Sequence, residues 1–170
     1  WTRRTSGTAH QLEDVTWSGS QFVVVGQQGT ILTSPNGLIW TSHPVGTSSG
    51  ILGVTWNGSQ LVAVGNQTIL TSPDGITWTS RSTVGMLNGL LGVSWNGNQF
   101  VAVGTEGLII TSPSGVNWTR RDPALVKDHL RSITSNGYQI VAVGYTGTLL
   151  TSPDGITWTR QTNSLPNATA

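Results

Sequence analysis

The nine residues TSPDGITWT occupy positions 71–79 and return unchanged at 151–159. Close variants, TSPNGLIWT and TSPSGVNWT, stand at 33–41 and 111–119, so the phrase recurs with a period near 40 residues. A period in this range is typical of solenoids and propellers. The sequence therefore predicts a protein built from four similar units.

Each unit contains four short runs of apolar and β-branched residues separated by turn residues. In the third unit these runs are 90–95, 99–104, 108–112 and 117–121. The apolar positions lack the 3.6-residue spacing of a helix, whereas short runs between turn residues are typical of strands. We therefore expect four antiparallel strands in each unit.

Two hairpins are predicted in each unit. Asn96-Gly97, between the first and second runs, favours a two-residue type I′ turn in which both residues have positive φ. In the fourth unit Ser135 replaces the tryptophan that ends this first run elsewhere, and Tyr138 across the turn is expected to supply the ring instead. The repeated phrase itself joins the third and fourth runs, and its Ser-Pro-Asp-Gly predicts a turn with positive φ at glycine.

The second run of each unit is apolar on both faces, so both sides of its sheet must be covered. Neighbouring sheets provide that cover when they are arranged radially, as blades of a β-propeller. We expect an all-β fold, a single β-propeller domain of four blades with four antiparallel strands each, over residues 1–170. The repeats are expected at about 1–39, 40–77, 78–117 and 118–157, with a fifth copy of the outer strand at 158–161.

The outer-strand phrase begins five times, once more than a ring of four blades needs. Its copies start at Trp1, Trp40, Trp78, Trp118 and Trp158. We expect a closed monomer in which either 1–4 or 158–161 forms the outer edge of the last blade. The alternative is a dimer in which two chains complete a larger ring, because an open edge recruits further strands.

Composition excludes several classes of function. Only 9% of residues are charged and the net charge is +1, so no nucleic-acid partner is expected. No apolar run is long enough for a membrane-spanning helix, and no membrane insertion is expected. Without cysteine the redox compartment stays open, and an extracytoplasmic bacterial location is compatible with the sequence.

The phrases SPNGLIW, SPDGITW and SPSGVNW resemble the Asp-box, or BNR, motif of sialidase-type propellers, usually written Ser-x-Asp-x-Gly-x-x-Trp. Units with VAVG and SPDG are also similar to bacterial repeats related to the YCF48 photosystem II assembly factor. One residue fewer separates the Asp position from glycine, and that position reads Asn36, Asp74, Ser114 and Asp154. The resemblance implies a propeller and no activity. Because Asn36 and Ser114 are neutral, Asp74 and Asp154 are expected to cap turns.

No enzyme, metal or cofactor is expected. The arginine cluster and the tyrosine–glutamate pair of a sialidase have no counterpart among Tyr138, Tyr145, Glu13 and Glu106. The three histidines lie in different units without metal-ligand spacing. The tryptophans recur in each unit, which favours packing between blades over stacking on sugars.

Binding is expected on the more variable of the two rims. This variable rim consists of the loops between second and third strands and the loops from each fourth strand to the next unit. Loops on a rigid scaffold commonly carry function. The expected binding residues are Arg121, Asp122, Lys127, Asp128, His129 and Arg131, together with Glu13, Asp14, His43, Glu106 and Tyr145.

The sequence thus predicts a non-catalytic binding or scaffold propeller whose variable rim contacts a protein or glycan partner. One alternative is a lectin with pockets between blades. The other is an engineered or excised repeat fragment without an evolved ligand.

Overall fold

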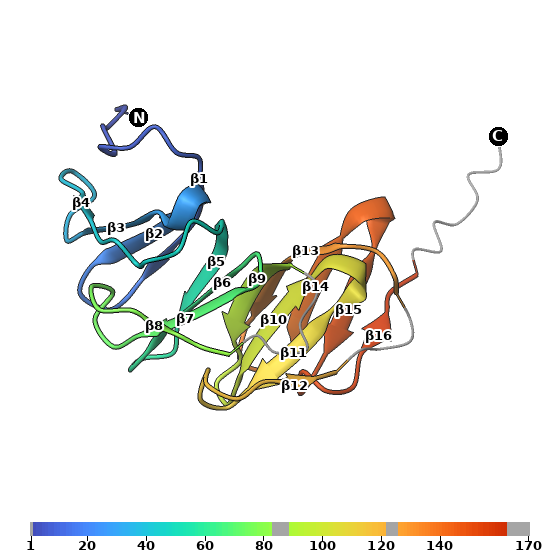
Figure 1. The fold of residues 1–170 in the computed structure, drawn as a ribbon. Helices are drawn as coiled ribbons and strands as arrows, with labels where there is room; N and C mark the ends of the chain where they lie inside the picture. The colour runs from blue at the N-terminus through green and yellow to red at the C-terminus, as the bar shows by residue number, and fades with distance from the viewer. Residues whose placement is uncertain (1, 83–88, 122–125, 163–170) are drawn as a thin grey trace.

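A computed structural model of the chain describes residues 2–82, 89–121 and 126–162. Its strands form four sheets of four antiparallel strands (Figure 1), and no α-helix occurs in the described part. Blade 1 consists of β1 (Leu12–Trp17), β2 (Phe22–Gly26), β3 (Ile31–Ser34) and β4 (Thr41–Ser42). Blade 2 consists of β5 (Ile51–Trp56), β6 (Leu61–Gly65), β7 (Thr68–Ser72) and β8 (Thr79–Ser80).

The second half of the chain repeats this arrangement. Blade 3 consists of β9 (Leu90–Trp95), β10 (Phe100–Gly104), β11 (Ile109–Ser112) and β12 (Thr119–Arg120). Blade 4 consists of β13 (Leu130–Ser135), β14 (Ile140–Gly144), β15 (Leu149–Ser152) and β16 (Thr159–Arg160). Within each sheet the strands follow chain order from the inner to the outer edge. The predicted all-β class with four four-stranded blades is confirmed.

The core consists of three apolar clusters, each between two neighbouring blades. The middle strands β6 and β10 are buried along their whole length. Successive side chains of a strand point to opposite faces. Val62 and Val64 therefore pack toward blade 3, whereas Leu61 and Ala63 pack toward blade 1. This double burial explains why the second run of every repeat is apolar throughout.

The blades form an open arc, and the prediction of a closed four-bladed ring is wrong. The inner strands pack in the order β1, β5, β9 and β13, and the first and last blades lie at opposite ends of the row in Figure 1. A ring of four would need a quarter turn between neighbouring sheets. Apolar contacts extend from Val54 in the inner strand to Trp78 beside the outer strand, so neighbouring sheets face each other across their width.

The outer edge of blade 4 is formed by the C-terminal copy of the repeated phrase. Thr159 pairs with Thr151, and Arg160 pairs with Leu150. Residues 2–4 belong to no strand. The C-terminal copy, and not residues 2–4, therefore forms the outer strand of the last blade.

The first hairpin of each blade differs from the predicted type I′ turn. Among the asparagine–glycine pairs, only the glycines have positive φ. The Asn96 side chain accepts hydrogen bonds from the backbone N–H groups of Asn98 and Gln99, at 3.0 and 2.8 Å. These bonds replace the type I′ geometry, because an asparagine whose side chain caps the turn holds it without adopting positive φ itself.

Tyr138 does not take the place of the tryptophan missing from β13. Ser135 pairs with Ile140, so Tyr138 lies in the hairpin loop and is 88% exposed. The prediction that it replaces the missing ring is wrong, because the loop contains four residues and places Tyr138 outside the strand.

The second hairpin confirms the turn predicted for the repeated phrase. Gly75 has a φ of 76°, and its N–H donates to the hydroxyl of Ser72 at 2.8 Å. Oδ1 of Asp74 accepts from the N–H groups of Ile76 and Thr77, both at 2.8 Å. Asn36 makes corresponding bonds in blade 1. The aspartates therefore cap turns.

Candidate functional site

The variable rim contains the turns between the second and third strands of the blades. Three of them are short 3₁₀ turns: η1 (Gln27–Gly29), η2 (Thr105–Gly107) and η3 (Tyr145–Gly147). The central residue of each has positive φ, as Gln67 has in the corresponding turn of blade 2. These central side chains are all exposed.

Main-chain hydrogen bonds hold the loops of this rim in place. The N–H of Gly107 donates to the carbonyl of Asp128, at 2.9 Å, and links the η2 turn of blade 3 to the loop that enters blade 4. A Cβ atom at Gly107 would collide with the Val126 carbonyl, so the close approach requires glycine. The N–H of Gly29 likewise donates to Ser49 between blades 1 and 2. The described turns of this rim therefore present their side chains from a backbone that hydrogen bonds hold in place.

Five of the predicted binding residues gather where blade 3 meets blade 4. The rings of His129 and Tyr145 are edge to face, with centroids 5.7 Å apart. The guanidinium of Arg131 lies 5.7 Å from the centre of the Tyr145 ring, in the range of a cation–π contact. The N–H of Glu106 donates to Nδ1 of His129, at 3.1 Å, and Asp128 lies beside His129 in the same loop. We call Glu106, Asp128, His129, Arg131 and Tyr145 the rim cluster.

Asp128 fixes the loop of the rim cluster to the turn of its own blade. Oδ2 of Asp128 accepts from the hydroxyls of Thr148 and Thr146, at 2.7 and 2.9 Å. These hydrogen bonds, with Thr148 contributing most, lower the pKa of Asp128. Asp128 is therefore ionised at neutral pH and positions its neighbours.

The outward groups of the cluster are the aromatic rings and the cations. His129, Arg131 and Tyr145 are all exposed, as is Lys127 in the same loop. An exposed ring beside a guanidinium provides an apolar face together with donors suited to a carboxylate or a backbone carbonyl. This arrangement can bind a polar segment of another molecule.

The rim cluster borders a polar groove along the axis of the arc. We call this the axial groove, and it is lined by the inner strands β1, β5, β9 and β13. One cavity along it, of about 310 Å³, has Asp14 and Arg131 in its wall. A second cavity of about 340 Å³ is lined by Glu13, Gln27 and Arg131, among others. Residues from blades 1 and 4 thus face the same groove, although β13 does not pack beside β1 as a neighbouring strand.

The acidic residues of the groove are held by hydrogen bonds. Glu13 accepts from the side-chain amide of Gln27 at 2.6 Å. Asp14 accepts from the N–H groups of Val15 and Val54, both at 2.8 Å. Burial raises the pKa of Asp14, and these two backbone bonds oppose that effect. Asp14 therefore links blade 1 to blade 2, whereas Glu13 faces the cavity.

His43 and Arg121 directly follow the outer strands β4 and β12 and do not belong to the rim cluster. Nε2 of His43 lies 2.8 Å from Oγ1 of Thr33, and Nε of Arg121 donates to Oγ1 of Thr111 at 3.1 Å. Arg81 makes the same contact in blade 2. These side chains connect outer strands to third strands. Asp122 lies outside the described residues.

The axial groove also contains residues that sequence reasoning missed. Gln11, Gln27 and Asn66 line the larger polar cavity beside Glu13. Gln27 and Asn66 begin the turns that follow the second strands, so their positions on the variable rim were a usable signal. Their amides add donors and acceptors to the charged groups of the groove.

The described residues contain neither a candidate membrane-spanning helix nor a candidate metal site. No helix there is long and apolar enough to cross a membrane. No three side chains of His, Asp or Glu in that part of the chain gather in a way that could hold a metal ion.

The chain resembles solved β-propellers in fold. It matches a structure of YCF48 bound to a D1 peptide with a TM-score of 0.73 and 20% identity, covering 92% of this chain and 55% of that one. It matches virginiamycin B lyase from Staphylococcus aureus with a TM-score of 0.80 and 12% identity, covering 94% and 58%. The WD40 repeats of RRP9 match with a TM-score of 0.72 and 12% identity, covering 91% and 52%.

These likenesses show that the four sheets are blades of a β-propeller. No family model matches the sequence, and no curated protein matches it. The chain spans slightly more than half the length of the propellers that it resembles. Because these include both peptide-binding and enzymatic proteins, the fold alone does not define an activity.

Proposed function

We propose that this chain is a non-catalytic binding propeller whose variable rim holds an extended segment of a protein partner. The observation that carries the proposal is the exposed Arg131–Tyr145–His129 group beside the axial groove. Aromatic rings and arginine are the side chains that most often dominate protein-binding surfaces. The peptide-bound YCF48 structure offers a precedent for this use of the fold.

The charges around the groove define the chemistry of the partner. Arg131 and Lys127 supply positive charge near blade 4, and Glu13 supplies a carboxylate in the wall near blade 1. A peptide with an acidic group toward blade 4 and a basic or amide group toward blade 1 complements this distribution. The hydrogen-bonded backbone of the described rim turns reduces the entropy lost on binding.

A catalytic role lacks support from the rim cluster. Nδ1 of His129 accepts a backbone N–H, and Asp128 accepts two threonine hydroxyls. The geometry gives His129 no nucleophile to activate within the cluster. Its groups therefore suit recognition more than chemistry.

Carbohydrate binding between blades is the weaker alternative. Nε1 of Trp78, Trp118 and Trp158 donates to the carbonyl of the turn glycine in its own blade, at 3.0 to 3.1 Å. The same tryptophans pack on the apolar clusters between blades, and Trp158 is 6% exposed. Because these rings pack against other side chains of the protein, little of their surface is left to stack on a sugar. The turn phrase, which is similar to the Asp-box, has a structural role in this proposal.

A display library of random peptides, followed by calorimetry, tests the proposal. We expect selected peptides to bind once per four-bladed chain and to carry acidic residues. A glycan array on the same sample should give no saturable signal. Binding of several equal glycans per chain, with no peptide selected, would refute the proposed function in favour of a lectin.

A further inference from the structure

Blade 1 exposes an apolar face that its counterparts in the other blades bury. Leu12 is 40% and Val15 55% exposed, whereas Ile51 and Val54, at the same positions of blade 2, are 0% and 4% exposed. The registers establish the equivalence, since Leu12 pairs with Gly26 as Ile51 pairs with Gly65. The corresponding residues of blades 3 and 4 are also buried. This face of blade 1 therefore has the composition of an interface between blades.

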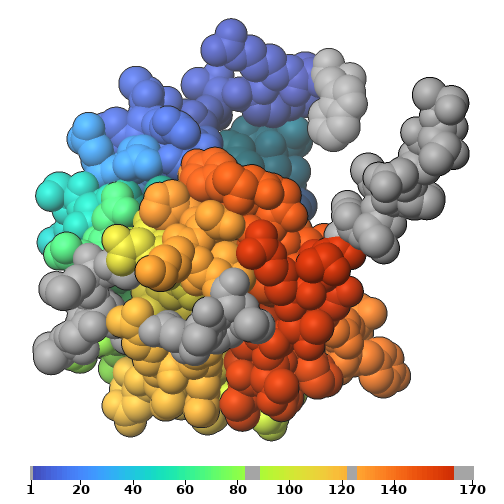
Figure 2. Space-filling model, turned by 90° about the vertical axis from the view of Figure 1, so that its right-hand side faces the viewer, coloured from blue at the N-terminus to red at the C-terminus, as the bar shows by residue number. Residues whose placement is uncertain are grey.

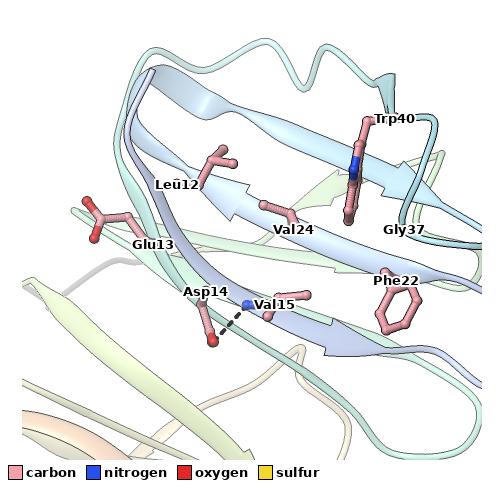
Figure 3. Close-up of a pocket in the computed structure, with 8 residues that line it drawn as sticks. All are labelled: Leu12, Glu13, Asp14, Val15, Phe22, Val24, Gly37 and Trp40. Atoms are coloured by element: carbon pink, nitrogen blue, oxygen red, sulfur yellow. Dashed lines mark hydrogen bonds between the residues drawn. The ribbon is translucent and has the colours of Figure 1, made fainter. Parts of the chain in front are cut away.

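The exposed Leu12 and Val15 line one cavity together with other apolar side chains of blade 1 (Figure 3). Leu12, Val15, Phe22, Val24 and Trp40 line an apolar cavity of about 430 Å³. The carboxylates of Glu13 and Asp14 point away from these side chains. We call this surface the blade 1 end face.

Blade 4 exposes the complementary kind of face at the other end of the arc. Val143 is 40% exposed, whereas Val25, Val64 and Val103, at the same position of the other blades, are all 0% exposed. Val141 on the same face is half-buried. In Figure 2 the described residues of blade 4, in orange and red, form much of the surface toward the viewer, and the first blade, in blue, does not lie over them. We call this the blade 4 end face.

The two end faces correspond to the two sides of every internal junction. Val23 and Val25 of blade 1 pack against Leu61 and Ala63 of blade 2. Val101 and Val103 of blade 3 pack against Ile140 and Ala142 of blade 4 in the same way. In blade 4, Val141 and Val143 occupy the positions that Val23 and Val25 have in blade 1. In blade 1, Phe22 and Val24 occupy the positions that Leu61 and Ala63 have in blade 2. The two ends of the arc thus carry the two surfaces that would form a fourth junction of the same kind.

A repeated hydrogen bond across the junctions supports this reading independently. The side-chain amides of Gln21, Gln60 and Gln99 donate to turn carbonyls of the next blade, those of Asp74, Ser114 and Asp154, at 2.7 to 2.8 Å. Gln139 is the fourth glutamine of this series and Asn36 the fourth turn residue. Among the described residues, neither the amide of Gln139 nor the carbonyl of Asn36 has this bond. One donor and one acceptor remain, each on the correct end face.

We propose that the blade 4 end face docks on the blade 1 end face of a second copy of this chain, in a head-to-tail dimer. The second copy offers in return its own blade 4 end face, so two junctions close a ring of eight blades, within the range known for propellers. Each junction repeats an interface that the chain already forms three times. Gln139 of each copy then donates to the Asn36 carbonyl of the other.

Closure of this ring also changes the axial groove. The inner strands of two copies surround it completely, so each rim cluster then borders an enclosed channel. This inference goes beyond the proposed function and does not depend on it, because the end faces and the rim cluster share no residue.

Light scattering and sedimentation of the 170-residue chain test the dimer. We expect a mass of twice 18.0 kDa that is stable over a broad range of concentration. Val15→Glu and Val143→Glu each place a charge on one end face at a position that is exposed in the single chain, so both should fold and remain monomeric. Val116→Glu is the matched control, since Val116 is 38% exposed in the turn of blade 3 and lies away from both end faces. It should stay dimeric.

Mixing the two monomeric variants tests the head-to-tail arrangement. Val15→Glu retains an intact blade 4 end face, and Val143→Glu retains an intact blade 1 end face, so an equimolar mixture should form a heterodimer through one junction. Gln139→Ala should weaken the wild-type dimer by about threefold or more, because each junction loses a hydrogen bond.

Three results would overturn the proposal. A wild-type chain that is monomeric at all concentrations would show that the end faces do not bind a second copy. A dimer that survives Val143→Glu would use another surface. A mass that keeps rising above the dimer would indicate open assembly instead of a closed ring.

Discussion

The side-chain amide of Gln99 in blade 3 donates a hydrogen bond to the carbonyl of Asp154 in blade 4, at 2.7 Å. Gln99 is buried, so this bond ties two blades together at the rim opposite the variable one. We expect Gln99→Ala to lower the free energy of unfolding by about 1 kcal/mol, because the part-buried bond between the blades is lost and the Asp154 carbonyl loses this donor. Chemical denaturation in the Val143→Glu background measures the effect in a single chain.

Gln139→Ala in the same background is the control. Its amide donates to no turn carbonyl among the described residues, so the free energy of unfolding should change by less than about 0.5 kcal/mol. Equal losses for the two variants would contradict the role given to the bond between blades.

Gly75→Val should be far more harmful than Asp74→Asn. Gly75 has a φ of 76°, and an added Cβ would lie 3.1 Å from Val23 and 3.3 Å from Leu61. Backbone strain and crowding together should cost about 2 kcal/mol or more. Asparagine retains the Oδ1 acceptor of Asp74, as Asn36 does in blade 1, so its effect should be small. Similar melting temperatures for the two variants would refute the turn assignment.

The turn aspartates predict a specific dependence of stability on pH. Backbone hydrogen bonds, from Thr77 for Asp74 and from Thr157 for Asp154, lower the pKa of both carboxyls below the ordinary value of 3.8. A lowered folded-state pKa contributes stability that is present above the unfolded value and is lost as pH falls through the folded one. We therefore expect stability to decrease below about pH 4.

The double variant Asp74→Asn with Asp154→Asn isolates this contribution. Its free energy of unfolding should be close to that of the wild type at neutral pH and should fall less steeply in acid. An unchanged acid slope, measured by denaturation at a series of pH values, would assign the acid sensitivity to other groups.

Arg121 and Lys127, both predicted from sequence to bind ligand, should behave differently. Arg121→Ala removes a hydrogen bond to Thr111 between the outer and third strands of blade 3, so we expect a loss of about 1 kcal/mol. Lys127 is exposed on the variable rim, and Lys127→Ala should leave stability unchanged while weakening the binding of acidic peptides. If Lys127→Ala instead lost stability and kept its affinity, the two assignments would be reversed.

Much of the fold could be predicted because short sequence patterns within each repeat determine its turns and strands. The Ser-Pro-Asp-Gly turns depend on contacts within one repeat. The second strands are apolar on both faces because equivalent strands of neighbouring blades cover them. The failure to close into a ring depends on the angle between blades, and that angle arises where whole sheets pack on one another, through residues as far apart in the chain as Val54 and Trp78. No single short segment encodes that angle.

The candidate site was predictable only in part for a similar reason. Asp128, His129 and Arg131 are close in sequence, and the structure adds Glu106 and Tyr145 from two different turns. His43 and Arg121 looked like free loop residues, yet each contacts a threonine ten positions earlier across the second hairpin. The recurrence of a polar residue two positions after each Trp-Thr pair was the signal for this structural role.

The affinity of the tightest selected peptide for Arg131→Ala tests the binding account most directly. Arg131 lies over the Tyr145 ring beside the axial groove, whereas Arg3 is an exposed cation in the segment before blade 1. Titration calorimetry should show that Arg131→Ala weakens binding by about tenfold or more, because a charged hydrogen-bond donor is lost, while Arg3→Ala has no effect. Undiminished affinity in Arg131→Ala would contradict the assignment of the rim cluster as the binding site.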